Sequence, residues 1–351
     1  IDGDVRQANS TVPSETEVSD SGMPSNVAEV AVTNVTPRRF WCKRTSTYRL
    51  LIGDQQKFHT APSGDGDGFD VTFHGVRGST PCHSAKLLKY GGNTSCVSLN
   101  IDGVDPVLFD LGTGLRYFGQ WLASDDALRA TVLLSHLHWD HIQGLPFFTP
   151  LLQNGSHLTI YGPAQEGDLT LQSVFADTIK PPIFPVHLEM LPGLIDFIEC
   201  WQNEFSIGTD AVPVEVMARS IPHVGNTLGY RVTARGATVA YLSDHQMPVD
   251  GSLGIDEGAL ELCRGADLLI HDAQYTPSEF ARKSTWGHCT IEYAVWAAAH
   301  AGAKQLALFH HDPTHDDAML DVLTAEAQRC GRELGVEVFA AREGQTIRVG
   351  G

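Results

Sequence analysis

Short apolar runs alternate with turn residues and amphipathic stretches along most of this chain, from Phe69 to its end. Short runs of this kind predict β-strands, and amphipathic stretches with an apolar stripe predict helices. Ten strands are expected, at residues 71–74, 95–101, 107–109, 131–134, 158–160, 214–218, 228–232, 239–242, 268–270 and 306–309. Six helices are expected, at residues 115–122, 142–152, 168–175, 258–263, 290–301 and 316–330.

The order of these elements predicts sheets packed together with helices outside them, rather than a strictly alternating parallel sheet. Residues 1–36 are rich in Ser, Thr, Val, Asp, Glu and Pro without a sustained period, which is typical of a tail or linker. Residues 37–68 mix basic and aromatic side chains, which favours an accessory segment packed on the main domain over a small contact surface. A Gly/Asp-rich stretch at 63–68 marks a boundary, so the main domain is expected at residues 69–351.

Composition narrows the classes of function. With 42 acidic residues against 24 basic ones, the net charge is −18, so nucleic acid is an unlikely partner. Seven scattered cysteines without a C-x-x-C pair indicate free thiols in a reducing compartment, hence a cytoplasmic location. No apolar run is long enough to cross a membrane, and no signal-peptide pattern opens the chain, although its first residue is Ile1 rather than Met.

The strongest chemical signal is the stretch Ser135-His136-Leu137-His138-Trp139-Asp140-His141, which follows a predicted strand. In an extended segment, residues two apart point the same way, so His136 and His138 can face one ion together. Asp140 and His141 follow where the chain turns toward the next element. Imidazole nitrogen suits zinc and similar metals, and a carboxylate can bind or bridge a second ion. The spacing therefore predicts a site for two metal ions.

Other metal-capable residues follow predicted strands further along the chain. They are Asp110, His223, Asp244 with His245, His271 with Asp272, and His310 with His311. Because strand ends at one rim of a sheet can converge, these side chains are expected to meet the first cluster. Two adjacent histidines follow the strand at 306–309, and either could be the ligand; His310 is preferred because it comes first.

The pattern H-x-H-x-D-H, followed by an isolated His, a strand-end Asp and a final strand-end His, resembles the metallo-β-lactamase superfamily of binuclear hydrolases over residues 69–351. Four further segments resemble its phosphodiesterase branch, which includes tRNase Z and bacterial cyclic phosphodiesterases: Tyr161-Gly162-Pro163, Gly229-Tyr230 after His223, Ser243-Asp244, and the H-x-T motif in Gly287-His288-Cys289-Thr290. The resemblance implies an α+β fold, a four-layer αββα sandwich with the site at one edge of the sheets.

The resemblance also assigns ligands. One ion would be held by His136, His138 and His223, and the other by Asp140, His141 and His310, with Asp244 bridging both. Zinc is the expected metal, and manganese or iron also fit. Asp110 matches an aspartate that orders the metal loop. His271 and Asp272 are candidates for orienting the ligands from behind, with structural ion pairs as an equal alternative.

Two ions about 3.5–4 Å apart can share a water molecule and hold it as hydroxide in line with a phosphorus atom. The expected reaction is hydrolysis of a small or cyclic phosphodiester. His288 is the candidate general acid, because imidazole titrates near neutral pH and the motif places it beside the leaving oxygen. Asp140 is a candidate for steering the proton of the hydroxide. The resemblance also makes a homodimer the expected assembly.

Three alternatives stay open. One is a tRNA 3′-processing endonuclease of the same branch, for which residues 163–220 lack the expected basic arm. Another is a carbonyl ester or lactone hydrolase on the same ions, and a third is a non-catalytic binding module. The Gly-rich turns at 75–80 and 91–94 are candidates for lining the pocket mouth. The aromatic residues Trp139, Phe147 and Phe148 are expected to pack rather than to stack on a base.

Overall fold

The computed structural model describes residues 67–122 and 127–351. The tail expected at 1–36 lies outside the described residues, and so does nearly all of the accessory segment expected at 37–68. The first strand starts at Phe69, where the main domain is expected to begin. None of the helices in the described ranges has the length and apolar character needed to cross a membrane.

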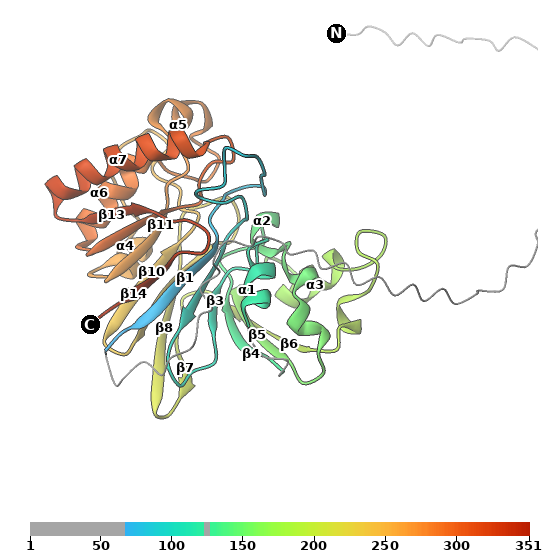
Figure 1. The fold of residues 1–351 in the computed structure, drawn as a ribbon. Helices are drawn as coiled ribbons and strands as arrows, with labels where there is room; N and C mark the ends of the chain where they lie inside the picture. The colour runs from blue at the N-terminus through green and yellow to red at the C-terminus, as the bar shows by residue number, and fades with distance from the viewer. Residues whose placement is uncertain (1–66, 123–126) are drawn as a thin grey trace, which may run out of the picture. The chain divides into compact units, whose positions relative to one another are not determined.

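Two seven-stranded mixed sheets form the centre of the fold (Figure 1). The first has the order β14-β1-β2-β3-β4-β5-β6, and the second has the order β13-β12-β11-β10-β9-β8-β7. The strands of the first sheet are β1 (Phe69–Gly75), β2 (Cys96–Asn100), β3 (Val107–Phe109), β4 (Arg129–Leu133), β5 (His157–Pro163), β6 (Leu194–Cys200) and β14 (Thr346–Val349). Those of the second are β7 (Glu204–Thr209), β8 (Val212–Ser220), β9 (Leu228–Ala234), β10 (Ala237–Leu242), β11 (Leu268–Asp272), β12 (Gln305–Phe309) and β13 (Glu337–Ala340).

Each sheet has an antiparallel half and a parallel half. In the first sheet, β3, β4, β5 and β6 run parallel, and in the second sheet β10, β11, β12 and β13 do. Parallel strands are covered on both faces and therefore need continuous apolar runs. Strand β10, Ala237-Thr238-Val239-Ala240-Tyr241-Leu242, is buried at every position. The parallel halves supply most of the strand ends that lead into the site.

The helices lie outside the two sheets. They are α1 (Leu115–Trp121), α2 (Trp139–Ile142), α3 (Leu171–Thr178), α4 (Glu257–Cys263), α5 (Pro277–Lys283), α6 (Ile291–Ala301) and α7 (Asp317–Leu334), with 3-10 turns at Leu145–Phe147, Thr149–Leu152 and Leu188–Met190. Helices α1, α2 and α3 pack on the first sheet, and α4, α6 and α7 pack on the second. The predicted αββα sandwich is confirmed.

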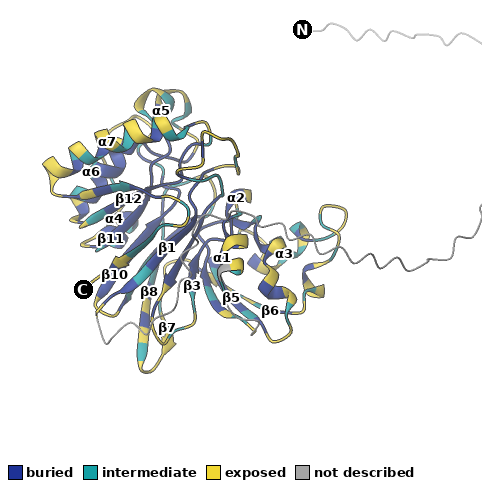
Figure 2. Cartoon of the chain, in the orientation of Figure 1, coloured by how far each residue is buried: buried dark blue, intermediate teal, exposed yellow. Residues whose placement is uncertain are grey.

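Apolar side chains fill the space between the sheets, as the dark strands of Figure 2 show. The rings of Phe109 and Tyr241, one from each sheet, stack with centroids 4.5 Å apart. Phe309 meets the ring of Tyr241 edge-on at 5.7 Å, and Phe73 lies 6.2 Å from Phe309. This core holds the ends of β3, β10 and β12 together, and the polar residues that follow these ends therefore share one edge of the sandwich.

All ten predicted strands are present, and five of the six predicted helices are. The helix expected at 142–152 is wrong: the chain forms the short α2 at Trp139–Ile142 and then two 3-10 turns. Pro146 and Pro150 lack the N–H groups that a continuous helix would need, so each proline begins a separate short turn instead. Strands β6, β7, β13 and β14 and helix α5 were not expected.

Candidate metal centre

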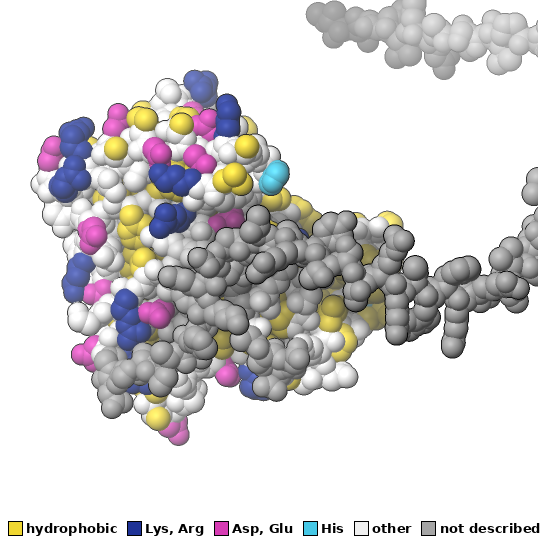
Figure 3. Space-filling view, viewed as in Figure 1, with side chains coloured by type: hydrophobic (Ala, Val, Ile, Leu, Met, Phe, Trp, Pro, Cys, Tyr) yellow, Lys and Arg dark blue, Asp and Glu magenta, His cyan; other side chains and the backbone are white. Residues whose placement is uncertain are grey.

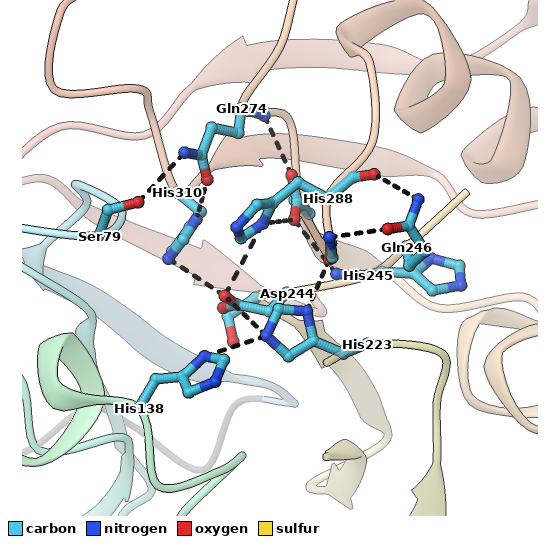
Figure 4. A network of polar contacts seen from close by, with 12 residues as sticks. Ser79, His138, His223, Asp244, His245, Gln246, Gln274, His288 and His310 are labelled. Atoms are coloured by element: carbon cyan, nitrogen blue, oxygen red, sulfur yellow. Dashed lines mark hydrogen bonds and ion pairs between the residues drawn. The ribbon is translucent and has the colours of Figure 1, made fainter. Parts of the chain in front are cut away.

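The predicted ligands meet at one edge of the sandwich, where strands from both sheets end. The first sheet contributes the segment after β4. In this segment His136 and His138 precede α2, and Asp140 and His141 lie within α2. The second sheet contributes the other three, His223 after β8, Asp244 after β10 and His310 after β12. In Figure 4 the side chains of His138, His223, Asp244, His288 and His310 point toward one another.

Asp244 lies at the centre of the group. Its Oδ2 atom is 3.4 Å from Nε2 of His310 and 3.8 Å from Nε2 of both His136 and His223. Its Oδ1 atom is 3.1 Å from Nε2 of His141. A carboxylate that faces ring nitrogens on both sides has the arrangement expected of a bridging ligand.

The remaining ligand-capable atoms form two subsets. On one side, Nε2 of His223 lies 3.2 Å from Nδ1 of His138, and the ring of His136 is next to both. On the other side, Oδ2 of Asp140 lies 3.1 Å from Nε2 of His310 and 3.3 Å from Nε2 of His141. Within each subset the ligand atoms lie within 4.8 Å of one another. The two subsets are the ones that the resemblance assigns to the two ions.

The donor set fits divalent cations. Nε2 of His136, Nε2 of His141 and Oδ1 of Asp244 are buried and make no hydrogen bond of good geometry, although the last two lie 3.1 Å apart. Buried polar atoms normally have partners, and three orphaned atoms aimed at a common centre indicate that a cation completes the site. Imidazole nitrogens and carboxylate oxygens are also the ligands that zinc accepts.

Charges within the cluster are strongly coupled. Burial opposes ionisation of Asp244, but His310, His141 and His136 hold the pKa of its carboxyl group well below the usual value. Burial also opposes protonation of His141, yet Asp244, Asp140 and Asp110 raise its pKa well above the usual value. Burial lowers the pKa of His223 to about 4. In the absence of cations, histidines close to several carboxylates take up protons to balance the negative charge.

Asp110 supports the metal loop from within the core. It follows β3 and is fully buried. Its Oδ2 atom accepts hydrogen bonds from Nδ1 of His141 and from the Tyr241 hydroxyl, both at 2.7 Å, and from the Ser135 hydroxyl at 2.9 Å. Its Oδ1 atom accepts from the backbone N–H of Ser135 at 2.7 Å. With Nδ1 of His141 donating to Asp110, Nε2 is left as the ligand atom.

His288 stands at the rim of the cluster and is held by Asp272. Its Nδ1 atom lies 2.7 Å from Oδ2 of Asp272 and 3.8 Å from Oδ2 of Asp244. The side chain of Gln246 fixes the backbone of the same segment, because it accepts from the Gly287 N–H and donates to the His288 carbonyl. The position suits proton transfer, but His288 is also close enough to Asp244 and His223 to be ligand-capable.

The two histidines after β12 have different surroundings. His310 faces the cluster, whereas Nε2 of His311 is bonded to the Ala341 carbonyl at 2.9 Å inside the core. His271 lies away from the seven predicted ligands, with Nε2 2.9 Å from Nδ1 of His245 and its ring near Tyr293. Its expected contact with the ligands is therefore not seen among the described residues.

Three residues near the ligands were not singled out from the sequence: Tyr241, Gln246 and Gln274. Gln274 accepts a hydrogen bond from Nδ1 of His310 at 2.8 Å. These side chains carry neutral groups that make ordinary core or turn contacts in most proteins, so their residue type gives no signal. Only the position of Gln274, two residues after Asp272 at the end of β11, could have suggested it.

Comparison with known proteins decides the family. Residues 106–311 match the profile of the beta-lactamase superfamily domain. The chain belongs to this superfamily. The match spans β3 to the residue after His310, and it therefore includes every predicted ligand. Membership confirms the resemblance that the sequence motifs predicted. It also confirms that the chain is a hydrolase of the metallo-β-lactamase fold.

The relatives of this superfamily member point to one branch. Ribonuclease Z of Pyrococcus furiosus is 26% identical over 299 residues, which cover 74% of this chain and 91% of the relative. The short form of human tRNase Z has the same fold, with a TM-score of 0.56 and 24% identity over 79% of this chain and 98% of that one. A diphosphatase of the PhnP family aligns with a TM-score of 0.55 and 19% identity over 80% of this chain and 97% of that one. The predicted phosphodiesterase branch is confirmed at this level.

Proposed function

We propose that this protein is a metal-dependent endoribonuclease of the ribonuclease Z kind, which cleaves a phosphodiester bond near the 3′ end of a tRNA precursor. The observation that carries this proposal is the convergence of seven ligand-capable side chains and a His288–Asp272 pair at one edge of the sandwich. The sequence relatives that share the fold over most of their length are named ribonuclease Z. They favour this function over hydrolysis of a small or cyclic phosphodiester, which the sequence first suggested.

Two divalent ions, proposed to be zinc, would supply an activated water and neutralise negative charge on the phosphate. His136, His138 and His223 would hold one ion, and Asp140, His141 and His310 the other, with Asp244 between them. His288 would then provide the proton for the leaving oxygen. Because Nδ1 of His288 donates to Asp272, its Nε2 atom is available to carry that proton. The buried carboxylate of Asp272 keeps the ring in this orientation.

Exposed aromatic rings beside the metal loop support a nucleic acid substrate. Trp139, between two predicted ligands, is 53% exposed, and Phe147 is 61% exposed. Phe148 is buried, as expected of a packed ring, whereas Phe147 packs edge-on against Phe184 at 5.8 Å and, like Trp139, stays largely exposed. The two rings border an apolar cavity of about 110 Å³ that is also lined by Phe184 and Ile183. Aromatic faces of this kind stack on the bases of single-stranded nucleic acids.

A second candidate remains, hydrolysis of a small or cyclic phosphodiester, and the charge distribution favours it. Residues 164–200, next to the site, contain six carboxylates and one lysine, Lys180. On the face shown in Figure 3, basic and acidic side chains are intermingled over helices α6 and α7. Phosphate contacts by Lys and Arg normally supply most of the affinity for nucleic acid. The relatives nevertheless make a nucleic acid substrate plausible, which corrects the expectation from net charge.

A comparison of substrates separates these functions. The metal-loaded protein would be given a tRNA precursor with a 3′ trailer, a 2′,3′-cyclic nucleotide, bis(p-nitrophenyl) phosphate and a p-nitrophenyl ester. The proposal expects one defined cut in the precursor, lost in Asp140→Asn and weakened steeply by added salt. Cleavage of only the small diesters would establish the second candidate. Rapid hydrolysis of the ester alone would indicate a carbonyl hydrolase.

Two further properties remain proposals. A homodimer is expected from the resemblance, and light scattering of the purified protein would test it. A cytoplasmic location is expected from the unpaired cysteines, and the six cysteines within the described residues are free thiols.

A further inference from the structure

A Gly-rich loop, Gly75-Val76-Arg77-Gly78-Ser79-Thr80, is held rigidly against the metal centre. Its anchor is Arg77, whose side chain is fully buried. The guanidinium group donates to the backbone carbonyls of Gly91 at 2.8 Å, Asp312 at 3.1 Å and His315 at 2.7 Å. The backbone of the loop also forms bridges to Thr94 and His311. Because the anchor reaches two segments that are far apart in the sequence, the residues after Arg77 have a defined position relative to the ligands.

The loop lies directly on one predicted ligand and bonds to another. A Cβ atom at Gly78 would lie 2.4 Å from Nδ1 of His310, so only glycine lets the backbone approach this ring. The next residue, Ser79, has φ +61° and donates its backbone N–H to Oδ2 of Asp140 at 2.7 Å. Ser79 is therefore within one hydrogen bond of the cluster, and its side chain is exposed at the mouth of the site.

Gln274 connects Ser79 to the other ligand. The amide group of this buried side chain accepts from Nδ1 of His310 at 2.8 Å through Oε1, and its Nε2 atom donates to the Ser79 hydroxyl oxygen at 3.2 Å. Asp140 and His310 are themselves 3.1 Å apart, which closes a ring of four residues that Figure 4 shows in part. Since His310 needs its Nε2 lone pair for a cation, Nδ1 carries the proton and fixes the orientation of the amide.

This orientation determines what the Ser79 hydroxyl can do. A hydroxyl group has one proton to donate and two lone pairs to accept with. The Ser79 oxygen already accepts from Gln274, so its own proton is directed elsewhere. The backbone N–H of Ser79 is used by Asp140, and the hydroxyl is the remaining donor of this residue next to the cluster. A substrate phosphate that reaches the metal ions would present its nonbridging oxygens to this donor.

We propose that the Ser79 hydroxyl donates a hydrogen bond to a nonbridging oxygen of the substrate phosphate, and that Gln274 is the positioning residue that turns it toward the substrate. This inference rests on the proposed function only in requiring a phosphodiester substrate, and it holds for RNA and for a small diester alike. It adds a phosphate-binding group that is supplied by the loop rather than by the ligands.

The test begins with Ser79→Gly in the metal-loaded full chain. Glycine tolerates the left-handed backbone and keeps the N–H bond to Asp140, so only the hydroxyl is removed. A hydrogen bond to a charged group is worth roughly 1.5–3 kcal/mol, so the Kd for inorganic phosphate and the KM for bis(p-nitrophenyl) phosphate should each rise about 10-fold to 100-fold. Metal content, measured by atomic emission, should stay at the wild-type value. Thr80→Ala, which removes the neighbouring hydroxyl, is the matched control.

Gln274→Glu then tests the positioning. Glutamate still accepts from Nδ1 of His310, but it also accepts the Ser79 proton, and the hydroxyl then turns away from the substrate. The variant should therefore weaken phosphate binding as Ser79→Gly does, with the metal retained. In the Ser79→Gly background, the same change should have only the smaller effect of its added charge, so the double-mutant cycle is non-additive.

Two results would overturn the inference: unchanged phosphate affinity in Ser79→Gly, or equal effects of Gln274→Glu with and without the Ser79 hydroxyl. Failure of the proposed function gives a different result. If the protein does not cleave RNA but Ser79→Gly still weakens phosphate binding, the inference about Ser79 stands and the ribonuclease proposal falls.

Discussion

Replacement of Asp110 by Asn would test how far the metal centre depends on a group in the core. The Asp110 carboxylate accepts from Ser135, His141 and Tyr241 in the interior between the sheets. Its backbone has φ +58°, a conformation that Asn tolerates better than most residues. The substitution therefore keeps the shape and backbone and removes the charge. The NH2 group of Asn would also take the place of one carboxylate oxygen that accepts hydrogen bonds. At least one buried donor would then face another donor.

The size of the effect follows from these contacts. Removing one member of a buried charged pair costs about 3–5 kcal/mol, and we expect a loss of unfolding free energy in this range for the metal-free protein. Losing the partner that orients a metal-bound imidazole typically weakens metal affinity about 10-fold to 100-fold. Tyr241→Phe is the matched control, because it removes one of the four hydrogen bonds and keeps the charge. It should cost about 1–2 kcal/mol.

Urea unfolding of the metal-free proteins would give the first quantity, and competition with a chromophoric chelator would give the second. A metal affinity for Asp110→Asn within about 3-fold of the wild-type value would refute the reasoning, since an orienting role predicts at least about 10-fold. A larger effect from Tyr241→Phe than from Asp110→Asn would refute it too. In that case the hydrogen bond of the Tyr241 hydroxyl, rather than the carboxylate charge, would hold the metal loop in place.

Three further predictions test the proposed general acid, a buried histidine and the packing of the core. His288→Ala should slow hydrolysis of a diester with an alkyl leaving group much more than that of bis(p-nitrophenyl) phosphate, because only the former needs a proton; equal slowing would contradict proton donation. Burial lowers the pKa of His74 to about 3, so stability should fall by up to about 1.4 kcal/mol per pH unit between pH 6.5 and 3, as the unfolded chain takes up the proton first. His74→Gln should flatten this slope in urea titrations, and an unchanged slope would assign the acid sensitivity to other groups. Phe73→Ala should cost about 3–5 kcal/mol of unfolding free energy, against less than about 0.5 kcal/mol for the exposed control Leu88→Ala; similar losses would contradict the assignment of Phe73 to the core.

The strands in the interior of each sheet could be predicted from the sequence, but the edge strands could not. The ten strands that were expected lie inside the two sheets, and most of their apolar positions are buried in the core. The four that were missed, β6, β7, β13 and β14, are the four edge strands of the two sheets. An edge strand is partly exposed and carries mixed residues. In β6, Leu194–Cys200, only the last position is buried. Its pairing with β5 determines that it is a strand.

The candidate metal ligands could be predicted because residue type and local spacing indicate their chemistry. His136, His138, Asp140 and His141 lie within six positions, and Asp244 and His310 each follow a buried apolar run. What local spacing leaves open is the direction of a side chain at a strand end. The choice between His310 and His311 is of this kind, since adjacent residues point to opposite sides. The end of β12 directs His310 to the cluster and His311 to the Ala341 carbonyl.

Asp110, Asp272 and His288 were expected near the ligands, but the other groups around the ligands were decided by the tertiary structure. Tyr241 and Gln274 carry neutral side chains that give no signal in the sequence, and Ser79 was covered only by the expectation that the Gly-rich turn at 75–80 lines the pocket mouth. The three residues come from segments far apart along the chain. Packing of the two sheets brings Tyr241 against Asp110, and the buried Arg77 anchor brings Ser79 beside Asp140. The candidate metal ligands are thus specified by their own chemistry. The contacts through which other residues orient them exist only after the two sheets have packed.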